Sequence, residues 1–330
     1  MSRVSVVIPN WNGMAHLETC MRALEDQTFR DFEVIVADNG STDDSRSYLR
    51  RRWPDATIVE LGANKGFPAA VNAGIEVATG SYVVLLNNDT KATPSWLERL
   101  VAAMDASPGH AWGSSKLLRF DEPDVIDSAG HTYSLWVGAA HNVGEGQPAD
   151  AFSDPRRVFG ATAAASIYRR SLFADIGAFD AEFFLVHEDT EFDLRANIAG
   201  HRCLYVPDAV IFHKRGASYE VAREIHLMGV RNRIWTTRTM PPGIVVLWFA
   251  TKALRAFRWI PAKLLGRRTS ARSAPSAWRD VSAADVLRAS LAALRSLPRK
   301  RREVASVRRL NSVQVLRLLS ETRSDARSNQ

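Results

Sequence analysis

The sequence predicts an α/β fold in which a mainly parallel central sheet is covered by helices on both faces. Four short runs rich in β-branched residues have the character of buried strands: "VSVVIP" (4–9), "FEVIVAD" (32–38), "ATIVEL" (56–61) and "SYVVLL" (81–86). Helical patterns fill the intervals between these runs. Strands and helices that alternate along a chain typically build a parallel sheet between two helical layers.

The helices of this first part are indicated by apolar spacing and by end signals. Apolar residues three and four apart place one face of a helix over residues 14–24. Ser41 is expected to cap a second helix, which Pro54 closes. Gly80 is expected to end a third helix over residues 67–80.

The second part of the chain is irregular at first and then ordered. Residues 111–160 contain short runs, several glycines and a polar loop at 141–150, and they predict a mixed region. A helix is expected over residues 187–200. A strand is expected over residues 203–213, in which Pro207 marks a bend or an edge position.

Charge is distributed unevenly between the two ends of the chain. Residues 241–330 hold 19 Lys and Arg against 5 Asp and Glu, a net charge of +14. The whole chain of 330 residues carries +7, so residues 1–240 carry −7. A basic extension behind an acidic globular part suggests an anionic partner for the extension.

The extension is predicted to be helical and to lie on an anionic membrane surface. Residues 241–268 alternate apolar, aromatic and basic side chains, as interfacial helices do. A further helix over residues 282–297 begins with a capping box of Ser282 and Asp285. Its apolar residues recur at helical spacing at Leu287, Leu291 and Leu294. Packing on the rest of the protein is the alternative, and nucleic acid is disfavoured because no nucleic-acid fold accompanies the basic runs.

The cellular compartment is predicted from the start of the chain and from its cysteines. A strand-like run begins at once, and residues 244–250 fall far short of the roughly 20 apolar residues that a spanning helix needs. Cys20 and Cys203 offer no disulfide framework, which fits a reducing compartment. We expect a cytoplasmic protein held peripherally at the inner face of the cell membrane.

Polar side chains follow three of the four predicted strands. Ligands of open α/β sheets bind beyond the carboxyl ends of the strands. A single polar strand end is ordinary, because Asn and Asp favour turns, but three at one rim predict a binding site. These residues are Asn10 and Asn12, then Asp38, Asn39 and Ser41, then Asn87, Asn88 and Asp89.

Two observations indicate the kind of ligand: two nucleotide-binding motifs are missing from the sequence, and Asp89 is a possible metal ligand. Neither G-x-G-x-x-G nor G-x-x-x-x-G-K-[ST] occurs, which disfavours a Rossmann dehydrogenase and a P-loop enzyme. Asp38 remains able to accept hydrogen bonds from a base or a ribose. Mg²⁺ characteristically uses one or two carboxylates together with substrate phosphates. Asp89, flanked by amides, therefore predicts half of a metal–diphosphate site.

Five segments occur in the order and spacing of family 2 glycosyltransferases: "VSVVIPNWNG", "VIVADNGSTDDS", "GANKGFPAAVNAG", "LLNNDT" and "HEDTEFDLR". The chain resembles this family over roughly residues 3–240, and within it the rhamnosyltransferases of bacterial cell-wall and surface polysaccharides. The resemblance implies a GT-A fold over residues 1–240, divided into a nucleotide-sugar half (1–115) and an acceptor half (116–240). The helical basic extension over 241–330 would follow it.

The resemblance also implies a nucleotide-diphosphate sugar donor, a divalent cation (Mn²⁺ or Mg²⁺) and inversion at the anomeric carbon. Asp38 matches the base-binding Asp, and Asp89 the last acidic position of the D-x-D motif, which here lacks its first carboxylate. His213 lies where a family His reaches the metal, so Asp89 and His213 are the expected metal ligands. The expected donor-binding residues are Pro9, Asn10, Asn12, Asp38, Asn64, Lys65, Asn87, Asn88 and Asp89. Trp11 either covers the base or belongs to the core.

Asp189 matches the family's catalytic base. An inverting transfer needs a base for the proton of the acceptor hydroxyl, and the predicted helix start at Asp189 favours an ionised carboxylate. Glu188, Glu191 and Asp193 compete for this role, although Glu191 is expected to point away from the helix face of Asp189. The predicted contacts to acceptor or phosphate are Glu188 and the segment Arg231-Asn232-Arg233, with Arg231 and Asn232 as candidates.

The predicted reaction is transfer of one sugar, best L-rhamnose from dTDP-rhamnose, to a polyprenyl-diphosphate-linked glycan. Absence of the Q-x-x-R-W motif of processive synthases favours a single addition. Two alternatives remain open. One is a family 2 enzyme that uses a UDP-hexose, and the other is a non-catalytic scaffold that binds glycan or lipid.

Overall fold

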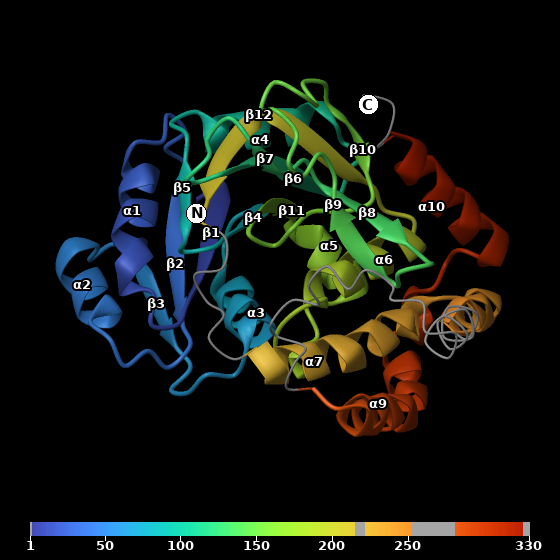
Figure 1. Cartoon of the computed structure of the whole chain (residues 1–330). Coiled ribbons are helices and arrows are strands. Elements are labelled where there is room, and N and C mark those ends of the chain that lie inside the picture. Colours follow the sequence, from blue (N-terminus) through green and yellow to red (C-terminus); the bar gives the residue numbers. More distant parts are fainter. Residues whose placement is uncertain (1, 215–221, 253–280, 326–330) are drawn as a thin grey trace.

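The computed structural model describes residues 2–214, 222–252 and 281–325 (Figure 1). Its strands are β1 (Val4–Asn10), β2 (Phe32–Asp38), β3 (Thr57–Glu60), β4 (Tyr82–Leu86), β5 (Thr90–Ala92), β6 (Trp112–Arg119), β7 (Ile126–Ser128), β8 (His131–Ser134), β9 (Ala139–Asn142), β10 (Arg156–Val158), β11 (Ala165–Arg169) and β12 (Cys203–His213). Its helices are α1 (Met14–Glu25), α2 (Ser45–Arg52), α3 (Phe67–Val77), α4 (Trp96–Ala106), α5 (Arg170–Ile176), η1 (Ala181–Phe183), α6 (Glu188–Ile198), α7 (Ala222–Trp235), η2 (Thr236–Thr239), α9 (Ala283–Glu303), η4 (Ala305–Val307) and α10 (Ser312–Asp325).

One large sheet runs through the described chain in the order β10-β12-β6-β11-β4-β1-β2-β3. β1 is parallel to β2 and to β4, and β2 is parallel to β3. β6 and β12 are also parallel, and β11 lies antiparallel between β4 and β6. The sheet is therefore mainly parallel, as predicted, while β8 and β9 form a separate hairpin.

Helices cover both faces of this sheet, which confirms the predicted layers (Figure 1). The pleat of β1 sends Val4, Val6 and Ile8 to one face and Val7 to the other. α1, α2 and α4 pack on the first face, and α3, α5 and α6 pack on the second. Because both faces are buried, the strands carry continuous apolar runs.

Two local predictions meet different outcomes. Ser41 does not cap the second helix: α2 begins at Ser45 with Asp44 at its N-cap, and the Ser41 hydroxyl accepts bonds from Asn10 and Asn12 instead. Pro207 does mark a bend, because the pairing of β12 with β6 shifts between Val206 and Val210. The Ser41 prediction failed because the loop continues for three more residues before the chain becomes helical.

The C-terminal helices pack on residues of the 116–240 range. α9 lies along α7 (Figure 1), where Ala293 and Leu297 are buried in a cluster with Trp235. α10 buries Val315 and Leu319 in another cluster, which includes Leu194 of α6. The basic and aromatic residues predicted at 253–268 lie outside the described residues. No helix within the described ranges is long and apolar enough to cross a membrane.

Candidate active site

The ends of β1, β2 and β4 are joined by a buried network around Asn10. Asn10 is buried, and its Nδ2 lies 3.0 Å from Ser45 Oγ, 3.1 Å from Ser41 Oγ and 3.3 Å from Asp38 Oδ1. Its Oδ1 accepts a 2.9 Å bond from Asn88. Satisfied buried networks hold their members in one arrangement. Three of the predicted donor residues, Asn10, Asp38 and Asn88, thus form a buried hydrogen-bonded base beneath the rim. A direct contact of Asp38 with a nucleotide base stays a prediction.

Exposed groups follow immediately after β1. Trp11 is 49% exposed, so it is no core residue. Asn12 is also exposed and has a left-handed backbone with φ of 50°, and its Oδ1 accepts a 2.8 Å bond from the Thr42 amide. Pro9 is half-buried at the end of β1. The structure therefore offers Trp11 and Asn12 to a ligand at the rim.

The turn at residues 64–66 is held against the rim by Asn39. Asn39 Nδ2 donates to Asn64 Oδ1 at 3.0 Å, and its Oδ1 accepts a 2.8 Å bond from the Lys65 amide. The Lys65 side chain is exposed and has no ion-pair partner among the described residues. Gly66, with φ of +86°, packs against Phe184, whose carbonyl accepts a 2.8 Å bond from the Phe67 amide. This contact joins the start of α3 to the segment that leads to Asp189.

Asp89 and His213 come together as predicted, because β12 pairs with β5 so that His213 lies opposite Thr90. His213 Nε2 lies 3.6 Å from Asp89 Oδ1, and His213 Nδ1 lies 2.8 Å from Asp127 Oδ2. Both carboxylates are buried. Burial raises the pKa of Asp89 above its usual value, against the opposing influence of His213.

These atoms suit a divalent cation. Oδ1 of Asp89 and Oδ1 of Asn87 are buried, and neither has a hydrogen-bond partner in the described chain. The bond between Asp127 and Nδ1 directs Nε2 of His213 outward, as buried carboxylates do for metal-bound histidines. No group of three or more His, Cys, Asp or Glu within the described ranges is arranged to hold a metal. A cation here would therefore need further ligands from a diphosphate or from water.

Asp189 lies in the first turn of α6, where it was predicted. Its Oδ1 accepts a 2.6 Å bond from the Thr190 amide, and its Oδ2 has no partner among the described residues. Neighbouring Glu188 is buried, and burial together with the charge of Asp189 raises its pKa to about 8. Burial therefore favours the neutral form of Glu188, and Asp189 is the half-exposed carboxylate of the two.

The two other acidic residues of α6 are committed elsewhere. Glu191 is fully buried and pairs with Arg238 at 2.8 Å and with Arg195 at 3.1 Å. Asp193 is also buried, 3.1 Å from the Trp112 indole nitrogen and 3.0 Å from His131 Nδ1. Neither carboxylate has room for a substrate hydroxyl, which leaves Asp189 as the candidate base.

Arg231 and Asn232 make their contacts within the protein, and their predicted contact with phosphate stays a prediction. Asn232 is fully buried, and its Nδ2 lies 2.8–3.0 Å from the carbonyl oxygens of Phe183, Leu185 and Val186. Arg231 donates to the carbonyls of residues 182 and 183 and stacks on Trp235. Phe184, Val186 and His187 all have positive φ, so this segment needs such support. We call residues 182–187 the strap.

Arg233 is the member of this basic segment that faces the site. It is exposed, and its Nε donates to His187 Nε2 at 3.2 Å. Burial and the Arg233 charge lower the pKa of His187 to about 4, so His187 accepts this bond as a neutral ring. The sequence named Arg233 together with its two neighbours but could not tell which side chain turns outward.

Two residues of the site carried no signal in the sequence. Asp127 supports His213, and His131 pairs with Asp193 behind Asp189. Burial alone lowers the pKa of His131, but the bond to Asp193 and the charge of Asp189 raise it overall. Both residues lie in the irregular region 111–160, where no motif marked them. Their roles follow only from the pairing of β7 with β6 and from the hairpin β8–β9.

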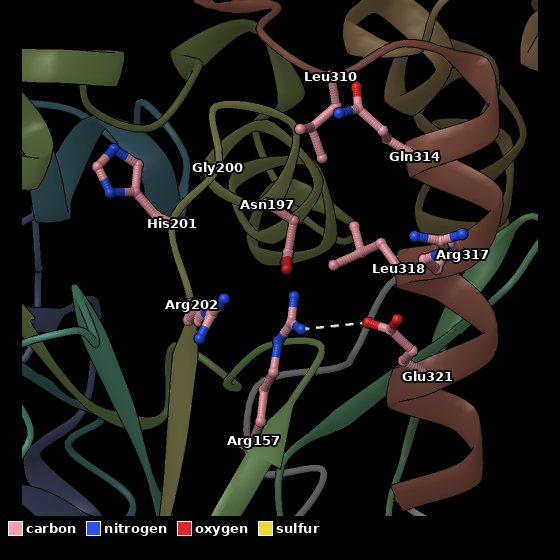
Figure 2. A pocket seen from close by; sticks show the side chains of 10 residues that line it. All are labelled: Arg157, Asn197, Gly200, His201, Arg202, Leu310, Gln314, Arg317, Leu318 and Glu321. Atoms are coloured by element: carbon pink, nitrogen blue, oxygen red, sulfur yellow. Dashed lines mark hydrogen bonds and ion pairs between the residues drawn. The ribbon is translucent and has the colours of Figure 1, made fainter.

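A cavity of about 200 Å³ lies elsewhere, between α10, the end of α6 and the start of β12 (Figure 2). Arg157, Arg202 and Arg317 line it, and Arg157 pairs with Glu321 at 3.5 Å. It opens at the end of β12 opposite to His213 and contains no residue of the candidate site.

Comparison with known proteins identifies the family. The model described as "Glycosyl transferase family 2" matches residues 5–177, more than half of the chain. The chain belongs to glycosyl transferase family 2. It is therefore identified as a glycosyltransferase.

Its curated relatives include enzymes of bacterial polysaccharide synthesis. An N-acetylglucosaminyl-diphospho-decaprenol L-rhamnosyltransferase of Mycobacterium tuberculosis is 29% identical over 235 residues, which cover 64% of this chain and 76% of the relative. The O-antigen biosynthesis protein RfbC of Myxococcus xanthus is 31% identical over 226 residues, 66% of this chain but only 18% of that protein. The predicted likeness to rhamnosyltransferases is confirmed.

Solved structures confirm the GT-A fold. GalNAc-T7 with UDP, GalNAc and Mn²⁺ matches with a TM-score of 0.60 and 16% identity, covering 74% of this chain and 49% of that one. Residues 1–349 of S. aureus TarS match with a TM-score of 0.54 and 16% identity, covering 99% of this chain and 93% of that one. At such identities the likeness shows the architecture alone.

Proposed function

We propose that this glycosyltransferase moves a single sugar, L-rhamnose from dTDP-rhamnose, onto a polyprenyl-diphosphate-linked glycan, with inversion at the anomeric carbon. One observation carries the proposal. A half-exposed carboxylate with an unpartnered oxygen, Asp189, lies in the first turn of α6 just after a strap that touches residues 66–67, and the Asp89–His213 pair lies where β5 begins and the neighbouring β12 ends.

In this proposal Asp189 takes the proton from the acceptor hydroxyl, which attacks the anomeric carbon as the nucleotide diphosphate leaves from the opposite face. Lys65 and Arg233 supply positive charge for the diphosphate groups of donor and acceptor. Asp89 and His213 would hold a cation, Mn²⁺ rather than Mg²⁺ because imidazole is a ligand, and Asn87 would complete its protein ligands. A divalent cation held there would stabilise the negative charge of the leaving diphosphate.

The donor is proposed to lie across the buried network of Asn10. Trp11 would cover the base, because its exposed indole follows the end of β1 directly. Asn12 and Asn64 would supply polar contacts at the edge of the site. The rhamnosyl donor and the lipid-linked acceptor are proposed from the relative of M. tuberculosis, whose name includes both chemistries.

A UDP-hexose is the second candidate donor. A GalNAc(5)-diNAcBac-PP-undecaprenol beta-1,3-glucosyltransferase of Campylobacter jejuni is 26% identical over 118 residues, 34% of this chain. Such a relative keeps a lipid-linked acceptor while it transfers a hexose. The choice between the two donors depends on the base and on the 2′-position of the ribose.

The test is a panel of dTDP-, UDP- and GDP-sugars with Mn²⁺ and a short-chain N-acetylglucosaminyl-diphospho-lipid, read as released nucleotide diphosphate. We expect turnover with dTDP-rhamnose, and loss of about 10²–10⁴-fold in kcat for Asp189→Asn. Asp124→Asn, an exposed carboxylate outside the site, is the matched control. Turnover with a UDP-hexose alone would establish the second candidate. Full activity of Asp189→Asn, or retention of anomeric configuration in the product by NMR, would contradict the proposed mechanism.

A further inference from the structure

α9 is folded with its most apolar stripe turned away from the protein. Leu287, Leu291 and Leu294 lie on one side of the helix and are 60%, 43% and 39% exposed. An amphipathic helix of a globular protein normally turns such a stripe toward the core. We call these three residues the leucine stripe.

The inner side of α9 is packed against the rest of the protein, so the helix is held in an orientation that leaves the leucine stripe exposed. Ala293 and Leu297 are buried against Trp235, and the Trp235 indole donates to Ser296 at 3.0 Å. Lys300 is 1% exposed and lies 2.6 Å from Asp180. The helix thus buries a charge on its inner side while it leaves three leucines outside. Rotating it to cover the leucines would break these contacts.

A row of arginines borders the leucine stripe. Arg288, Arg295 and Arg302 are all exposed and are separated by seven residues, so they lie in line along the helix. Arg288 bonds to Asp285 at 2.9 Å. Arg295 and Arg302 have no ion-pair partner among the described residues. Apolar side chains beside cations without an ion-pair partner suit an anionic lipid surface, where acyl chains lie beneath negatively charged headgroups.

We propose that the leucine stripe and the arginine row dock the enzyme on an anionic lipid bilayer. The leucines enter the acyl boundary, and the guanidinium groups contact lipid phosphates beside it. This inference rests on the proposed lipid-linked acceptor, which places the reaction at a membrane. A second copy of the chain is a poorer occupant, because a two-fold interface on this face would bring two arginine rows together.

The docking helix is tied directly to the strap before the catalytic base. Arg299 pairs with Glu182 at 2.7 Å, and Lys300 lies 3.0 Å from the same carboxylate. Asp180, just before the strap, accepts from Lys300 as well. A bilayer held by α9 therefore lies at a fixed place relative to Asp189, which suits an acceptor whose lipid stays in the membrane.

The test is co-sedimentation of the full chain with phosphatidylcholine vesicles that do or do not contain phosphatidylglycerol, at physiological salt. We expect binding to the anionic vesicles and at least about tenfold weaker binding for the triple variant Leu287→Ser/Leu291→Ser/Leu294→Ser. Each Arg→Gln change at 288, 295 and 302 is expected to weaken binding about fivefold. The matched control is Val313→Ser/Leu316→Ser on α10, which removes 69% and 41% exposed apolar side chains and should leave binding unchanged.

The readouts separate this proposal from the proposed reaction. The melting temperature and its rise with added nucleotide should be the same in the triple leucine variant and the wild type, since the stripe touches neither core nor rim. The proposal would be overturned if the triple leucine variant bound anionic vesicles as well as the wild type does. It would also be overturned if the wild type did not bind them. Light scattering that shows a dimer in the wild type and a monomer in the variant would assign the stripe to a second copy, which also overturns it. None of these results depends on turnover.

Discussion

Burial divides the acidic residues of the site into groups with different tasks. Burial favours the neutral form of Glu188, Asp189 has an oxygen with no partner among the described residues, and Asp127 bonds to His213. Neighbouring carboxylates in different environments commonly serve different roles. At the scale of single residues, the chemistry is therefore set by which carboxylates reach solvent and which are paired.

Asp127→Asn is expected to weaken Mn²⁺ binding by about 10- to 100-fold, because the neutral amide holds the His213 ring less firmly and makes Nε2 a poorer ligand. Mn²⁺ affinity measured by electron paramagnetic resonance, with nucleoside diphosphate present, checks this. Asp124→Asn, three residues away and exposed, is the control. Equal affinity in both variants would show that Asp127 has no part in metal binding.

Glu188→Gln is expected to change how stability depends on pH. Folding raises the pKa of Glu188 from 4.5 to about 8, so between these pH values the unfolded chain ionises this group while the folded protein does not. This costs the wild type up to about 1.4 kcal/mol per pH unit as pH rises through the window, and the cost levels off above it. Urea unfolding at a series of pH values should show Glu188→Gln gaining stability relative to wild type across the window. Glu76→Gln, on the exposed side of α3, should run parallel to the wild type.

Elements matter here through the strap and the helix that supports it. The strap contains three non-glycine residues with positive φ. Asn232 of α7 donates hydrogen bonds from its Nδ2 to three carbonyl oxygens of the strap. α9 adds ion pairs from Arg299 and Lys300 to Glu182 of the strap. The position of Asp189 at the start of α6 thus depends on two helices that follow it in sequence.

Asn232→Asp is expected to lower both kcat and the free energy of unfolding, by about 1–3 kcal/mol for the latter, because it removes the Nδ2 donor of three carbonyls at nearly constant volume. Steady-state kinetics and urea unfolding measure the two effects, and limited proteolysis reports opening of the strap. Asn311→Asp, an exposed residue before α10, is the control. An active and fully stable Asn232→Asp protein would refute the support that α7 gives the strap.

Lys300→Met and Arg299→Met form a matched pair of neighbours that both lie near Glu182. Lys300 is 1% exposed and Arg299 is 48% exposed. Loss of the buried cation leaves Asp180, whose side chain is 11% exposed, with one ion-pair partner fewer and is expected to cost about 3 kcal/mol. Loss of the exposed one is expected to cost less than about 1 kcal/mol. Chemical unfolding of the two variants decides the matter, and equal costs would mean that burial of Lys300 is unimportant.

The whole molecule is stabilised by packing between segments far apart in sequence. α10 packs on α6, the helix that carries the candidate base Asp189, and α9 packs on α7. A predicted boundary at residue 240 therefore separates regions of different composition and charge, while apolar clusters continue across it. We expect the chain to unfold as one unit.

Val315→Ala is expected to destabilise the protein by about 2 kcal/mol, since Val315 is fully buried against α6. Val313→Ala, two residues earlier and 69% exposed, should change stability by less than about 0.5 kcal/mol. Calorimetry of Val315→Ala should show one transition at a lower temperature. Two transitions, with only one of them shifted, would show that residues 241–330 form an independent unit.

The sequence by itself determined the order of strands and helices over residues 4–86, the polar strand ends at one rim and the place of Asp189 near a helix start. These features depend on apolar period, turn residues and motifs, which are local along the chain. The tertiary structure decided which polar groups stay open. In the folded protein Asp127 bonds to His213, 86 residues away, the Asn232 amide donates to carbonyls of the strap, and the leucine stripe faces outward. Partners of this kind are chosen by contacts between distant segments, and no local pattern records those contacts.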